Sequence, residues 1–157
     1  MRRAIFITAL VAVLALLFVT SAPAGSIMDR ILKRGELVVG TTGTQPPLNA
    51  TTKDGKIIGL DADIAKGIAI SMGVKIQFKT MPFAELLPAL HDDKVDLILS
   101  SMTMTPERNL KVAFIGPYYI SGKGMLTKTQ TIATLQAAEN LNDPQFKLAT
   151  LKASTSR

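Results

Sequence analysis

The segment KVDLILSSMTMTPER, residues 94–108, decides the fold. Residues 95–99 form a short, mostly apolar run between polar residues, which is typical of a buried strand. Hydroxyl side chains follow this run, and Pro106 with Glu107 opens a helix. The segment therefore predicts a strand, a polar turn and a helix. In open α/β sheets, small ligands bind at such junctions, at the carboxyl end of the strand.

The polar turn carries groups that suit a carboxylate. Arg108 offers a planar guanidinium whose donor fork matches two carboxylate oxygens. Hydroxyl groups are available at Ser100, Ser101, Thr103 and Thr105. A capped surface helix with an incidental arginine explains the same residues, so this segment alone leaves both interpretations open.

The rest of the chain alternates segments typical of strands with segments typical of helices. The predicted strands cover residues 36–40, 74–80, 94–99, 111–115 and 118–127. The predicted helices cover residues 26–34, 62–72, 83–91 and 106–110, and a hairpin is expected at 48–59 with its turn at 53–56. This order predicts an α/β class with a largely parallel sheet.

Two acidic residues stand at the start of the helix predicted to end before Gly73. We expect Asp61 to be its N-cap and Asp63 to lie in its first turn, because capping is a far commoner role there than catalysis or metal binding. Ile64, Ile68 and Met72 recur at helical spacing, with alanines beside them, and mark the expected buried face. In the next helix, Pro88 is expected to cause a kink or an early end.

The first 24 residues have the pattern of a secretory signal peptide. Arg2 and Arg3 precede an uncharged apolar run at 4–20, and Ala22-Pro23-Ala24 is a small-x-small cleavage motif. We expect cleavage after Ala24 and a periplasmic location. A retained membrane anchor is the alternative, since 17 apolar residues lie at the lower limit of a bilayer span.

Composition narrows the class of partner. Loss of Arg2 and Arg3 lowers the formal charge from +6 to +4, and the excess is spread thinly, with two Tyr and few Phe to stack on bases. A nucleic-acid partner is therefore not expected. The chain has no cysteine, so an apolar core rather than disulfides must hold it together. We expect no metal site, no cofactor and no catalytic residue, and we assign the single His91 to a solvated helix end.

Several motifs, taken together, make the chain similar to the extracellular solute-binding proteins of family 3, which deliver polar amino acids to ABC importers. The motifs that carry the resemblance are GELVVG (35–40), GLDADIA (59–65), Phe83 ahead of LPAL (87–90), KVDLI (94–98), SMTMTPER (101–108) and GPYYISG (116–122). The resemblance implies a two-lobed clamshell of the periplasmic-binding-protein type, with the ligand between the lobes.

The resemblance also implies roles for individual residues. Arg108 matches the arginine that clamps the ligand's α-carboxylate, with Ser101 and Thr103 supplying further donors. Ser100 matches the residue that meets the ammonium, and Phe83 the aromatic side of the pocket. The sixth candidate ligand-binding residue is Thr42.

Thr42 is one of several departures from the pattern, because many members carry an acidic residue there. Leu48 and Gln45 stand where an aromatic residue is common. The ammonium is then met by the second lobe, or the ligand lacks one. The Thr41-Thr42-Gly43 loop also resembles periplasmic cyclohexadienyl dehydratases, which use the same fold as enzymes.

Length completes the expectations drawn from the resemblance. We expect a signal peptide at 1–24, a nearly complete first lobe at 25–122, and a crossover with the start of a second lobe at 123–157. A helix at 132–141 and a strand at 146–151 would open that lobe. Because family members are longer by half or more, we expect a fragment or a truncated product.

Three functions follow. The leading one is a non-enzymatic receptor that captures a small carboxylate-bearing solute, an amino acid, for the membrane permease of an ABC importer. A dehydratase-like lyase acting on prephenate or a similar acid is the second, although the sequence offers no persuasive general acid or base. An extracellular sensor domain is the third.

Overall fold

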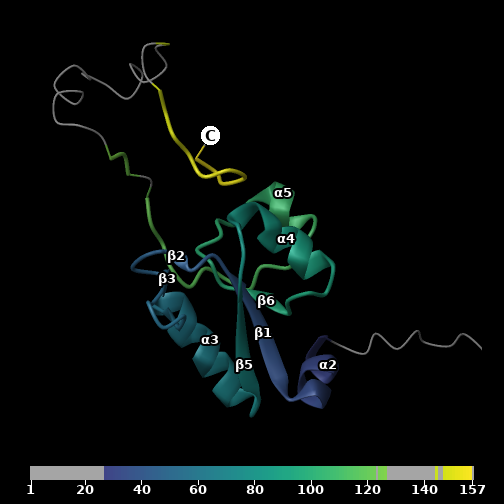
Figure 1. Ribbon diagram of the computed structural model, residues 1–157. Helices are drawn as coiled ribbons and strands as arrows, with labels where there is room; N and C mark the ends of the chain where they lie inside the picture. Colours follow the sequence, from purple (N-terminus) through teal and green to yellow (C-terminus); the bar gives the residue numbers. More distant parts are fainter. Residues whose placement is uncertain (1–26, 123, 127–143, 145–146, 157) are drawn as a thin grey trace, which may run out of the picture. The chain divides into compact units, whose positions relative to one another are not determined.

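The computed structural model describes residues 27–122, 124–126, 144 and 147–156 (Figure 1). The chain divides into two units, Met1–Arg34 and Gly35–Arg157. In the first unit the described part is helix α2 (Ile27–Arg34), which confirms the helix predicted at 26–34. The predicted signal peptide lies outside the described residues. Within the described ranges, no helix combines the length and apolar character needed to cross a bilayer.

A three-stranded parallel sheet forms the centre of the second unit (Figure 1). Strand β1 (Glu36–Thr41) lies between β5 (Lys75–Thr80) and β6 (Leu97–Ile98). Glu36 pairs with Lys75 and the register runs on to Thr41 and Thr80. Because the second parallel strand lies on one side of β1 and the third on the other, the strand order reverses beside β1. Ligands bind at such a reversal, outside the carboxyl ends of the strands.

Strand β1 is buried from Leu37 to Thr41, as expected for a central strand of a parallel sheet. Helix α3 (Leu60–Ser71) contacts β1 and β5, and helix α4 (Phe83–His91) contacts β1 and β6. The buried apolar side chains of these elements are Leu37, Val38, Val39, Ala62, Ala65, Ala69, Phe83, Leu86 and Ala89. Burial of these side chains holds both helices against the sheet and positions the carboxyl end of β1.

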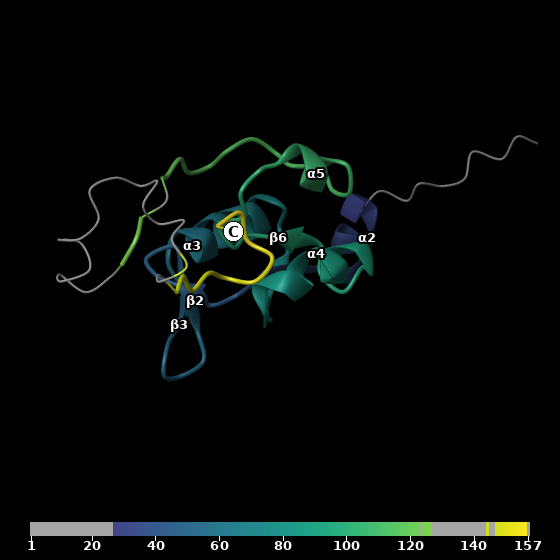
Figure 2. The same cartoon turned by 90° about the horizontal axis from the view of Figure 1, so that it is seen from above.

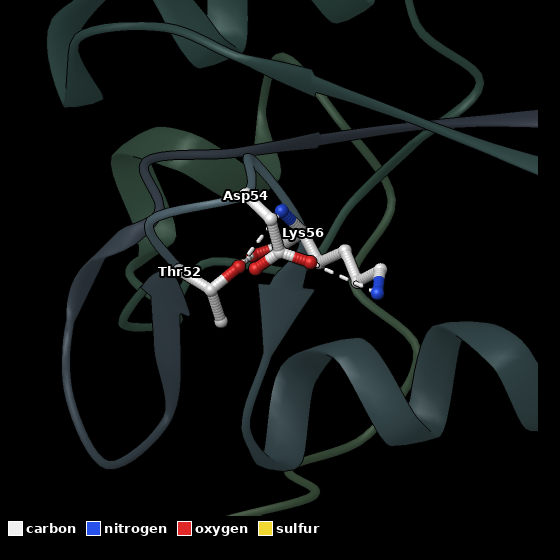
Figure 3. A network of polar contacts seen from close by, with 3 residues as sticks. All are labelled: Thr52, Asp54 and Lys56. Atoms are coloured by element: carbon white, nitrogen blue, oxygen red, sulfur yellow. Dashed lines mark hydrogen bonds and ion pairs between the residues drawn. The ribbon is translucent and has the colours of Figure 1, made fainter.

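A second, antiparallel sheet follows β1 and contains β2 (Thr44–Gln45), β3 (Asn49–Thr51) and β4 (Ile57–Ile58). It confirms the predicted hairpin, which projects away from the central sheet in Figure 2. At the turn, the Lys56 ammonium lies 2.9 Å from an Asp54 carboxylate oxygen, and the Lys56 N–H donates to the Thr52 hydroxyl (Figure 3). Lys56 first, and then Thr52, lower the pKa of Asp54 below its ordinary value. These side chains are solvated, so the pair contributes little to stability.

Helix α3 begins two residues earlier than its sequence predicts. Its N-cap is Gly59, with φ +111°, and no side chain caps it. A Cβ on Gly59 would stand 2.5 Å from the Leu48 carbonyl oxygen, so only glycine fits. That carbonyl accepts a bond from the Asp61 N–H at 2.9 Å. The expectation that Asp61 is the N-cap is therefore wrong, because a hairpin carbonyl satisfies the free backbone donor and leaves the carboxylate for other partners.

The buried face of α3 also differs in detail from the prediction. The fully buried apolar positions are the alanines Ala62, Ala65 and Ala69, whereas Ile64, Ile68 and Met72 are half-buried. Small side chains face the sheet because the helix packs closely against it. Helix α4 runs through Pro88 to His91, so the proline does not end it.

The predictions fail mainly after the third strand. Strand β6 keeps only Leu97 and Ile98, although Val95 and Leu99 beside it are buried. Helix α5 (Pro106–Asn109) forms as predicted, with Thr105 as its N-cap. The strands expected at 111–115 and 118–127 are absent from the described parts of those ranges. Ile115 and Ile120 are about nine-tenths exposed, at 90% and 88%, so no neighbouring strand pairs there. The predicted helix at 132–141 lies outside the described residues, and 147–151 is irregular.

Candidate functional site

The candidate site lies where β1 and β6 end. Past the last paired residues, the Leu99 N–H still donates to the Gly40 carbonyl at 3.1 Å. Just beyond this bond, the Thr42 N–H donates to the Ser100 hydroxyl at 3.0 Å. A side chain thus continues the hydrogen bonding that the backbone ladder begins. Two predicted site residues, Thr42 and Ser100, are brought together in this way.

A buried polar cluster supports this junction. The Thr42 hydroxyl lies 2.9 Å from Asn49 Oδ1 and 3.0 Å from Gln45 Oε1. The Ser100 hydroxyl lies 3.0 Å from the same Gln45 oxygen. Ser100 and Asn49 are 0% exposed, so these groups must satisfy one another rather than water. The cluster holds the loop after β1 in one position.

Asp61 is the charged centre of this cluster and is 1% exposed. Its Oδ2 accepts a bond from Asn49 Nδ2 at 2.7 Å and lies 3.4 Å from the Ser101 hydroxyl. Its Oδ1 accepts a bond from the Tyr118 hydroxyl at 2.9 Å. Both carboxylate oxygens are therefore committed within the protein, which makes Asp61 a positioning group.

Tyr118 joins the segment after α5 to this cluster. Its hydroxyl accepts a bond from the Ser101 N–H at 3.2 Å while it donates to Asp61. Burial, and then the Asp61 charge, raise the pKa of Tyr118 well above its usual range. Ser101 has φ +51°, a conformation that costs energy for a residue with a side chain. The contacts of Asp61 and Tyr118 hold it there.

An open pocket of about 460 Å³ lies beside the polar cluster. It is lined by residues from the loop after β1, the start of α4 and the C-terminal segment: Thr42, Thr44, Thr80, Met81, Pro82, Phe83, Ala84, Leu151 and Lys152. The pocket thus brings together Thr42 and Phe83, two predicted binding residues that the sequence separates by 41 positions.

Arg108 stands at the border of this pocket. Its guanidinium carbon lies 5.6 Å from the centre of the Phe83 ring, within cation–π range. One terminal nitrogen donates to the Thr103 carbonyl and the other to the Ala153 carbonyl, both at 2.8 Å. The Thr105 hydroxyl, accepting from the Arg108 N–H at 3.2 Å, fixes the start of α5. The guanidinium is thus held against an aromatic ring with its donor fork on carbonyl oxygens, which a carboxylate can replace.

The structure therefore treats the six predicted residues differently. Thr42 and Phe83 line the pocket, and Arg108 borders it. Thr103 is exposed, and its hydroxyl lies 3.4 Å from that of Thr155. Ser100 and Ser101 belong to the cluster instead. The ligand-binding role of all six residues stays a prediction.

Sequence reasoning missed four residues of the site. Asn49 and Lys152 carried no signal, and Asp61 was assigned to a cap. Tyr118 belongs to the GPYYISG motif, but sequence reasoning assigned no role to its side chain. Within the described ranges, no group of three or more His, Asp or Glu side chains could hold a metal ion.

Comparison with known proteins decides the family. Residues 37–154 match the model of the bacterial extracellular solute-binding proteins, family 3. The chain belongs to this family. The match includes β1, the loop after it, α5 and the C-terminal segment, so it contains every residue of the candidate site. The α/β fold with a parallel sheet agrees with this membership and with the predicted class.

Three relatives illustrate the range of the family. A probable amino-acid ABC transporter-binding protein of Haemophilus influenzae is 35% identical over 82% of this chain and 50% of its own length. The cyclohexadienyl dehydratase of Pseudomonas aeruginosa is 34% identical over 76% of this chain and 44% of its own. The arginine-bound form of domain 1 of TmArgBP, the ArgBP of T. maritima, has a TM-score of 0.56 and 43% identity over 58% of this chain and 72% of that one. The chain spans about half the length of the curated relatives it matches.

Proposed function

We propose that this protein captures a small carboxylate-bearing solute, an amino acid, outside the cytoplasm and presents it to the permease of an ABC importer. The observation that carries the proposal is the position of Arg108, whose guanidinium lies against Phe83 beside an open pocket. Relatives named as amino-acid-binding components of ABC transporters support the choice of solute.

The proposed capture begins with exchange of partners at Arg108. Its donor fork now meets two neutral carbonyl oxygens, from Thr103 and Ala153. A carboxylate in their place forms charge-assisted bonds, which are about twice as strong as neutral ones. The Phe83 ring limits the guanidinium's movement, so little side-chain entropy is lost on binding. Thr42 also lines the pocket, where its hydroxyl is bonded to Asn49 and Gln45.

The organisation of the chain is part of the proposal. Residues 1–24 serve as a signal peptide cleaved after Ala24, which places the mature protein in the periplasm. Residues 25–122 form the first lobe, and 123–157 the crossover and the start of the second. The crystallised domain 1 of TmArgBP, described as arginine-bound, supports binding of an amino acid by a first lobe.

Isothermal titration calorimetry of the purified protein with a panel of the twenty amino acids tests the proposal. We expect saturable heat with at least one amino acid at millimolar or tighter Kd. Absence of binding across the panel, from a protein that unfolds cooperatively, would contradict it.

A second candidate is a lyase, because the chain is 34% identical to a cyclohexadienyl dehydratase. Incubation with prephenate and detection of phenylpyruvate by its ultraviolet absorbance separates the two functions. Binding of amino acids without turnover favours the receptor. Sustained formation of phenylpyruvate would establish the enzyme.

A further inference from the structure

The pocket has an uneven charge. Its described lining contains three threonine hydroxyls, at Thr42, Thr44 and Thr80, and one cation, at Lys152. The other described lining residues are uncharged, so this lining presents positive charge and hydroxyl donors but no carboxylate. A ligand in the pocket therefore meets groups that favour oxygen anions.

Arg108 adds a second cation at the border of the pocket. It contacts the ring of Phe83, which lines the pocket, and donates to the carbonyl of Ala153, the residue after Lys152. Neither Arg108 nor Lys152 forms an ion pair with any residue in the described part of the chain. Two positive charges thus converge on one cavity without an anion from these residues to balance them.

Asp61, the acidic group of the polar cluster beside the pocket, cannot supply that balance. Asp61 is 1% exposed, and its two oxygens already accept bonds from Asn49 and Tyr118. A ligand with a cationic side chain would therefore meet Lys152 without a counter-charge. Like charges at short range disfavour binding, whereas opposite charges favour it.

We infer that this pocket selects solutes that carry two carboxylates. One carboxylate binds the Arg108 fork and the other lies near the Lys152 ammonium, with the hydroxyls of Thr44 and Thr80 donating to either. The inference rests on the proposed function and narrows it, since it separates this pocket from one suited to a basic amino acid. Lys152 is its specificity-determining residue.

Calorimetric titration of the purified protein with L-glutamate, glutarate, L-glutamine and L-arginine tests the inference. We expect L-glutamate or glutarate to bind about fivefold more tightly than glutamine and arginine. This factor is the upper range of the effect of one exposed charge pair. The two diacids distinguish recognition of a dicarboxylate alone from recognition that includes the ammonium, and tight binding of either supports the inference. The preference should shrink at high salt, because salt screens exposed charges.

Two charge-reversal variants test whether the preference for a diacid depends on Lys152. Lys152→Glu should weaken binding of the preferred diacid about fivefold or more. Lys147→Glu is the matched control, since it makes the same change of charge on the same segment at an exposed residue outside the pocket lining. Equal loss in both variants would overturn the role of Lys152.

The outcomes separate the inference from the proposed function. Tighter binding of glutamine or arginine than of either diacid would overturn the inference and leave an amino-acid receptor. Absence of binding by every compound, together with failure of the twenty-amino-acid panel, would overturn both.

Discussion

Two polar regions lie side by side at the end of β1, and they differ in how their charges are satisfied. Around Asp61, each oxygen of a buried carboxylate has a partner within the protein. Around Arg108, a half-buried guanidinium lies at an open pocket and, among the described residues, donates only to carbonyl oxygens. The contacts of the first region hold the loop after β1 in place, whereas the guanidinium of the second region can exchange its carbonyl partners for a ligand. Variants in each region should therefore separate stability from binding.

The largest expected effect is on stability, from Asp61→Ala. The substitution leaves the Asn49 amide and the Tyr118 hydroxyl without their acceptor in a buried site. We expect the free energy of unfolding in urea to fall by about 3 kcal/mol. Asp63→Ala is the control, since Asp63 lies in the same helical turn but is exposed and paired with Lys66 at 3.2 Å. It should cost no more than about 1 kcal/mol, and equal losses would refute the role given to Asp61.

The next effect is on binding, from Arg108→Ala. Loss of the donor fork should weaken ligand affinity by about 2 kcal/mol, roughly 30-fold. Arg108→Lys keeps the charge but not the fork and should recover only part of the affinity. Titration calorimetry measures both, with Lys66→Ala as a control for removal of a cation elsewhere. Unchanged affinity in Arg108→Ala would show that Arg108 does not bind the ligand's carboxylate.

A smaller effect on stability is expected from Tyr118→Phe, about 1 kcal/mol, because one hydroxyl bridges Asp61 and Ser101. Its pH dependence is diagnostic. Folding raises the pKa of Tyr118, so above pH 10.0 the unfolded chain loses a proton that the folded protein keeps. The free energy of unfolding should fall as the pH rises beyond that value, and less steeply in the variant.

Tyr119→Phe is the matched control, since Tyr119 is similarly exposed, at 51% against 42% for Tyr118, but does not contact Asp61 among the described residues. Urea unfolding between pH 8 and 11 makes the comparison. Parallel pH profiles for wild type and Tyr118→Phe would show that this hydroxyl does not contact Asp61 in the folded protein.

The smallest effect is expected at the hairpin turn. Asp54→Asn removes the pair with Lys56, but both side chains are solvated, at 60% and 78% exposure. We expect no measurable change in the urea midpoint, because exposed pairs are screened and cost side-chain entropy to hold. A marked loss would mean that the hairpin contributes to the cluster more strongly than its contacts indicate.

Local sequence signals predicted the elements whose partners are close in the chain. Strand β1, helix α4 and helix α5 match their predicted ranges within about one residue. The strands expected at 111–115 and 118–127 failed because a strand needs a neighbour, and apolar composition cannot supply one. Ile115 and Ile120 are accordingly exposed.

The sequence points to a candidate site residue where the chemistry of its side chain is distinctive. Arg108 is such a residue, because few side chains offer a carboxylate a planar fork. Asp61 was misassigned because acidic residues at helix starts usually cap, and nothing local reveals that the Leu48 carbonyl already meets its N–H. No local sequence pattern marks Lys152, and only the folded structure shows that it lines the pocket.

The most direct test of the clamp is NMR observation of the Arg108 side chain during titration with the tightest-binding amino acid from the calorimetric panel. We predict that the Arg108 Nε–Hε resonance shifts and saturates at the same ligand concentration as the Thr42 backbone amide. An unchanged Arg108 resonance, while other residues report saturable binding, would contradict the account.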